Sequence, residues 1–84
     1  MKLYYITFRS VTHAQRAEKL LSAKDLRCSL QRTPRWMEAQ GCGYALRVWA
    51  KEPETAVQLL RTHNIPMRRL YLQEPGGELE EMSL

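Results

Sequence analysis

Apolar and polar residues alternate along four short segments of the chain, with the two-residue period of a half-buried β-strand. In the first segment, Tyr4, Ile6 and Phe8 share one face. The predicted strands cover residues 3–9, 26–31, 44–49 and 67–73. This pattern predicts a sheet that turns one face toward an apolar core.

Two further segments repeat apolar residues at the spacing of an amphipathic helix. The first runs from Thr12 to Lys24, and Thr12 with Gln15 fits a capping box, in which each side chain bonds the other residue's backbone. The second begins near Pro53, a residue suited to the first turn of a helix, and ends near Asn64. The elements therefore follow one another as strand, helix, strand, strand, helix, strand.

This order predicts an α+β, ferredoxin-like βαββαβ fold, with a four-stranded antiparallel sheet and two helices on one face. A chain of 84 residues allows only one such domain, which we expect at residues 1–73. Residues 74–84 begin Glu-Pro-Gly-Gly and show no face for a core. They are expected to form an acidic, mobile C-terminal tail.

The net charge of +4 is divided unevenly along the chain. All 13 Lys and Arg lie within residues 1–73, where only five acids oppose them, which leaves +8 on this domain and −4 on the tail. A basic domain of this kind favours anionic partners. The sequence contains no apolar run of about 18 residues and no signal-peptide cleavage site, so we expect a cytoplasmic protein that does not associate with membranes.

The two cysteines, Cys28 and Cys42, are expected to be free thiols in a reducing compartment. Cys28 falls on the core side of its strand, which predicts a buried and inert thiol. Cys42 stands between Gly41 and Gly43, at the end of a loop over residues 33–43. Glycines beside a sulfur allow another protein or an anion to approach it closely, although they are equally typical of a plain turn.

The predicted topology brings further polar residues to the edge of the sheet that holds Cys42. They are Arg9, Ser10, Thr12 and His13, from the start of the first helix, and Arg35 from the loop. A helix N-terminus and neighbouring cations lower the pKa of a thiol from about 8.5, which produces the nucleophilic thiolate. The alternatives are a capping role for His13 and a solvated position for Arg35.

No metal site and no cofactor are expected. The cysteines and histidines are too far apart in the sequence for the paired ligands of a structural zinc site, and no glycine-rich phosphate loop is present. A single reactive thiol without an assured base indicates a carrier more than a catalyst with its own turnover.

Three stretches, at residues 8–21, 33–35 and 42–47, together resemble the selenium/sulfur carrier protein-like family, a small bacterial family formerly classed as a domain of unknown function. The resemblance covers roughly residues 3–72. It implies that Cys42, in a Cys-Gly motif, holds sulfur or selenium as a persulfide or perselenide. It also implies a donor protein and an acceptor protein as partners.

A second class of function is RNA binding, because residues 43–49 are faintly similar to a motif of RNA-recognition modules. That alignment would turn Arg47 toward the helices without a partner, so the opposite register is expected. The opposite register exposes one basic, aromatic face, which carries Tyr5, Thr7, Arg47, Trp49, Arg69 and Tyr71. We expect this face to form a homodimer in preference to binding nucleic acid, and a dimeric small-ligand regulatory domain is a third alternative.

Overall fold

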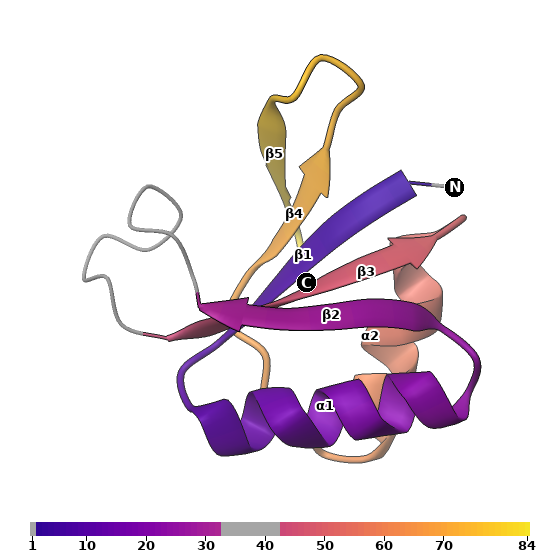
Figure 1. The fold of residues 1–84 in the computed structure, drawn as a ribbon, viewed down its shortest axis with the longest axis vertical. Coiled ribbons are helices and arrows are strands. Elements are labelled where there is room, and N and C mark those ends of the chain that lie inside the picture. Colours follow the sequence, from indigo (N-terminus) through magenta and orange to yellow (C-terminus); the bar gives the residue numbers. More distant parts are fainter. Residues whose placement is uncertain (1, 33–42) are drawn as a thin grey trace.

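The computed structural model describes residues 2–32 and 43–84 of the chain. In this part, five strands form one antiparallel sheet in the order β2-β3-β1-β4-β5, accompanied by two helices (Figure 1). The elements are β1 (Lys2–Phe8), α1 (Val11–Ala23), β2 (Arg27–Arg32), β3 (Tyr44–Ala50), α2 (Pro53–Thr62), β4 (Leu70–Gln73) and β5 (Leu79–Met82). The expected α+β class with an antiparallel sheet is confirmed.

Both helices cover the same face of the sheet, and one apolar core lies between the two layers (Figure 1). Tyr4, Ile6 and Phe8, which the alternation places on one face, are each at most 2% exposed. The helices contribute Ala14, Ala17 and Leu21 from α1 and Ala56, Val57 and Leu60 from α2. The predicted alternation therefore identifies the buried side of the sheet.

The sheet has five strands, so the expectation of four is wrong. The fifth, β5, comes from the segment expected to form a tail, and it pairs with β4. Gly77, at φ +91°, lies in the turn between these strands, and its N–H donates to the Glu74 carbonyl oxygen at 2.9 Å. The alternation of apolar and polar residues does not predict this strand, because its apolar residues stand only at its two ends. Leu79 packs beside Tyr71, and Met82 packs against the core.

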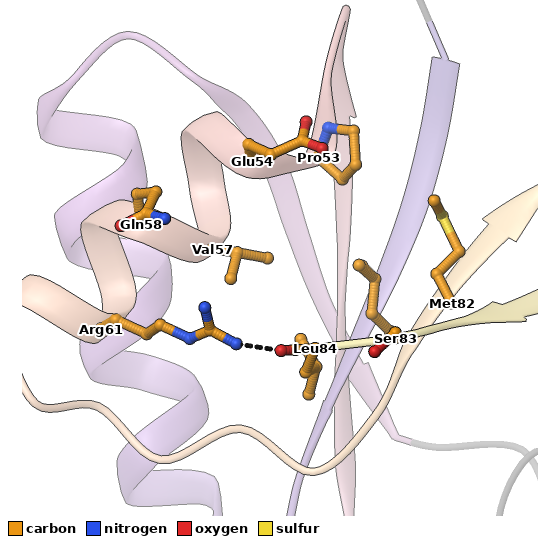
Figure 2. Close-up of a pocket in the computed structure, with 9 residues that line it drawn as sticks. Pro53, Glu54, Val57, Gln58, Arg61, Met82, Ser83 and Leu84 are labelled. Carbon is orange, nitrogen blue, oxygen red and sulfur yellow. Dashed lines mark hydrogen bonds between the residues drawn. The ribbon is translucent and has the colours of Figure 1, made fainter.

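A cavity of about 120 Å³ lies where β5 meets the helix layer (Figure 2). Val57 of α2 lines it on one side and Met82 of β5 on the other. The Arg61 guanidinium donates a hydrogen bond to the Leu84 carbonyl oxygen across it. The chain after β5 therefore turns from the sheet to α2, which it contacts through Leu84.

The strand β4 begins at Leu70, later than the predicted start at residue 67, because the chain bulges next to Thr7. Two residues, Arg68 and Arg69, oppose this one residue of β1, as in a β-bulge. The Arg68 N–H donates to the Thr7 carbonyl oxygen at 2.8 Å, and the Thr7 N–H donates to the Arg69 carbonyl oxygen at 2.9 Å. The Arg69 N–H donates to the Thr7 hydroxyl at 3.0 Å. The Thr7 hydroxyl thus accepts the Arg69 N–H, which has no backbone acceptor in the regular ladder of β1 and β4.

The face of the sheet turned away from the helices carries the odd-numbered residues of all five strands, and we call it the open face. Two of the residues expected to be exposed there are buried, so for them the expectation is wrong. Thr7 is 0% exposed at the bulge, and Tyr71 is 8% exposed. Tyr71 is covered because it packs with Tyr5 and with Leu79, which belongs to the unpredicted strand β5.

Candidate functional site

The edge of the sheet where β1 ends and α1 begins is the edge at which the sequence predicts the Cys42 site. Phe8, the last residue of β1, pairs with Tyr44, the first residue of β3. Gly43 precedes Tyr44 directly and Arg9 follows Phe8 directly, so both lie at this edge. The predicted site residues that the structure brings together here are Arg9, Ser10, Thr12, His13 and Gly43.

Three of the predicted site residues, Arg35, Gly41 and Cys42, lie outside the described residues, and their roles stay predictions. Their described neighbour, Gly43, is buried and has a φ of +131°. Side chains with a Cβ rarely adopt such an angle, whereas glycine takes it readily. The backbone conformation at the start of β3 therefore explains by itself why a glycine follows Cys42.

Ser10 has a structural role at this edge, as the N-cap of α1. Its backbone is extended, with φ −125° and ψ 150°, and its hydroxyl accepts a hydrogen bond from the His13 N–H at 3.2 Å. The predicted capping box of Thr12 and Gln15 is therefore wrong. Serine and threonine cap helices by the same mechanism, and the chain reaches Ser10 first on leaving β1.

Replacing Ser10 by alanine is expected to lower the free energy of unfolding by about 1 kcal/mol, because one N–H of the first helical turn loses its acceptor. Urea unfolding followed by circular dichroism measures the change. Thr12→Ala is the matched control: it removes an exposed hydroxyl two residues away and should cost less than about 0.5 kcal/mol. A larger cost for Thr12→Ala than for Ser10→Ala would contradict the observed cap.

A cavity of about 180 Å³ opens beside the first turn of α1. It is lined by Arg9, His13, Pro66, Met67 and Arg68. The His13 Nδ1 atom is buried and has no hydrogen-bond partner among the described residues. A lining that includes two arginines and a histidine gives the cavity a chemistry suited to an anion.

The contribution of residues 66–68 to this edge is not evident from the sequence pattern, which assigns them in part to a strand. The bulge holds them here, since Arg68 bonds to the backbone of Thr7, near the end of β1. A topological rule could have found them. Because β4 runs antiparallel to β1, the residues that precede β4 must lie where β1 ends.

The other cysteine, Cys28, is a free cysteine on β2. Its Sγ atom lies 3.5 Å from the Ser22 Oγ atom and donates to the Glu18 carbonyl oxygen at 3.7 Å. It is half-buried, not fully buried as expected, because β2 is an edge strand of the sheet. The thiol is therefore held against α1, away from the edge where α1 begins.

Within residues 2–32 and 43–84, no three side chains of His, Cys, Asp or Glu lie together in a way that could hold a metal ion. The two helices in this part of the chain have 13 and 10 residues. A membrane-spanning helix needs about 20 apolar residues. Neither described helix is long and apolar enough to cross a membrane.

The chain matches the sequence model of the family described as Putative Se/S carrier protein-like over residues 3–72. No curated protein and no solved structure matches it. The matched range extends from β1 into β4 and includes the Cys42-Gly43 pair. The resemblance that the motifs suggest is confirmed, and the chain belongs to the Putative Se/S carrier protein-like family.

Proposed function

We propose that the protein carries sulfur or selenium on Cys42, as a persulfide or perselenide, and passes it from a donor protein to an acceptor protein. The observation that carries this proposal is the family match, which spans residues 3–72 and so includes Cys42. The edge at which Gly43 enters β3 supports it, because the same edge holds the N-terminus of α1. A reducing cytoplasmic location is part of the proposal, since it keeps the thiol free.

The transfer step is a thiol exchange. The Cys42 thiolate attacks the outer sulfur of a persulfide on the donor protein, and a new sulfur–sulfur bond forms as the old one breaks. The donor cysteine leaves as a thiolate. The transferred sulfur keeps its oxidation state, so no oxidant or reductant is needed. The acceptor protein then takes the sulfur from Cys42 by the same step.

Cationic groups near Cys42 would favour this chemistry, because both the thiolate and the persulfide are anions at neutral pH. Arg9 and His13 line the cavity beside α1, together with Arg68. We propose that these groups, with Arg35, stabilise the anionic cargo while it is held. His13 lines this cavity, and its Nδ1 atom is buried without a hydrogen-bond partner among the described residues.

A carrier suits this chain better than an enzyme that releases free sulfide. Release would require a second thiol to attack the persulfide on Cys42 and close a disulfide. The other cysteine, Cys28, is half-buried and its Sγ atom contacts Ser22 and Glu18. With Cys28 held in this way, the acceptor protein must supply the attacking thiol.

Mass spectrometry of the intact chain tests the proposal. After incubation with a cysteine desulfurase and cysteine, the wild-type chain is expected to gain the mass of one sulfur atom. Cys42→Ser should gain nothing, and Cys28→Ser, the matched control, should load like the wild type. A wild-type chain that stays unloaded while a known persulfide acceptor is loaded would overturn the proposal, as would loading of Cys42→Ser.

A further inference from the structure

One row of side chains crosses the open face of the sheet from end to end. In strand order it consists of Ser29, Arg47, Tyr5, Tyr71 and Glu81, since each is paired in register with the next. Residues paired in register point to the same face of a sheet. Arg47 and Glu81 therefore lie on the same face, near opposite ends of the row.

The positive end of the open face is built around Trp49. The Arg27 Cζ atom lies 4.8 Å from the centroid of the Trp49 ring, and the Arg47 Cζ atom lies 4.9 Å from it. The Arg47 Nε atom is buried and has no hydrogen-bond partner among the described residues. Two guanidinium groups are thus fixed against one aromatic ring by cation–π contacts.

The negative end of the open face is the edge strand β5. Glu81 is exposed and pairs with Tyr71 of β4, so its carboxylate lies on the face that carries Arg47. Between the two ends, Leu3 and Tyr5 of β1 supply half-buried apolar surface. The open face is therefore basic along β2 and β3 and apolar in the middle, and its far side carries Glu81 of β5 as well as the exposed Arg69 just before β4.

We infer that two copies of this chain pack through their open faces, about a two-fold axis parallel to β1. The strand β1 is the middle one of the five, so this axis lays β1 on β1 and the β2–β3 side of one copy over the β5–β4 side of the other. Glu81 of the second copy then lies over Ser29, beside Arg47 and Arg27, and this contact occurs twice. An axis perpendicular to the strands would lay each strand on itself and bring like charges together.

The face fits a second copy better than a nucleic acid, because the row from Arg47 to Glu81 carries both charges in a self-complementary order. A phosphate backbone crossing the face would meet Glu81 as well as the two arginines. Five strands about 4.8 Å apart, four to seven residues long, give a face roughly 20 Å on a side, about half of what each partner buries in a standard interface, so the dimer is expected to be weak. The inference does not depend on the proposed role of Cys42.

Sedimentation equilibrium of the full chain tests this interface. The wild-type chain is expected to be a dimer that weakens as salt rises from about 0.05 to 0.5 M, because screening reduces the ion pairs. Glu81→Arg and Arg47→Glu should each raise the dissociation constant at least about tenfold, since each change occurs twice in the dimer. The double variant, with the charges at positions 47 and 81 exchanged, should recover part of the wild-type affinity, because Arg27 still opposes the new arginine.

Glu80→Arg is the matched control, because Glu80 is the exposed neighbour of Glu81 and points to the other face of the sheet. It should leave the dissociation constant unchanged, and circular dichroism of every variant checks that the fold is kept. A monomeric wild-type chain at low salt would overturn the inference. So would a double variant no tighter than either single one. A monomeric chain that retains single-stranded RNA would assign the face to nucleic acid instead.

Discussion

Replacing Phe8 by alanine is expected to lower the free energy of unfolding by about 3–5 kcal/mol. Phe8 is 1% exposed and heads the large, fully buried side chains of the described core. Its removal leaves a cavity between the sheet and the helices that the backbone cannot fill, because Phe8 is fixed by its pairing with Tyr44. A domain of this size has about 5–10 kcal/mol of stability in total, so much of it would be lost. Urea unfolding at 25 °C measures the change.

Phe8→Leu separates the loss of volume from the loss of the aromatic ring. Leucine keeps most of the apolar volume, so it should cost less than about 1.5 kcal/mol. If Phe8→Leu cost as much as Phe8→Ala, the loss of stability would not come from the cavity that alanine leaves at position 8. The leucine variant should also still load Cys42, since it preserves the pairing of β1 with β3.

Thr7→Val is expected to cost about 1–3 kcal/mol, although it keeps the shape of a fully buried side chain. The hydroxyl of Thr7 accepts the Arg69 N–H at the bulge, at 3.0 Å, and valine offers no acceptor. The Arg69 N–H would then lose its partner in the sheet. Amide hydrogen exchange followed by NMR gives a direct measurement, because the Arg69 amide should exchange faster in the variant.

Thr7→Ser provides the comparison for the exchange experiment. Serine keeps the hydroxyl and loses a methyl group, so it also lowers the free energy of unfolding. The two variants should differ at the Arg69 amide, which stays protected in Thr7→Ser and loses protection in Thr7→Val. Equal protection in both variants would contradict the role given to the hydroxyl.

The sequence pattern predicts the strands and helices that bury a regular apolar face. It fails for β5, where Leu79 and Met82 stand on either side of two glutamates. An edge strand needs pairing on only one side and leaves much of its surface to solvent, so its residues need not alternate. Nothing in the four residues alone distinguishes such a strand from an acidic loop.

The part of the candidate site that follows from the order of the elements could be predicted from the sequence. The order of elements is enough to bring Arg9 and Gly43 to the same edge, because β1 and β3 pair antiparallel. The sequence could not decide between Ser10 and Thr12 as the helix cap, since both residue types cap helices. The direction of the chain after β1 selects Ser10. The position of Arg68 depends on a bulge, in which one strand has an extra residue. The local sequence pattern does not predict this bulge.

The bulge at Thr7 also decides which of the residues before β4 face the apolar core. Counting back from Leu70 in strict alternation would set Arg68 beside Phe8, with its charge in the apolar layer. The surplus residue shifts the count by one, so that Met67 packs against the core instead. Arg68 instead reaches the cavity at the start of α1, beside His13. One extra residue thus keeps a cation out of the interior and places it at the cavity that Arg9 and His13 also line.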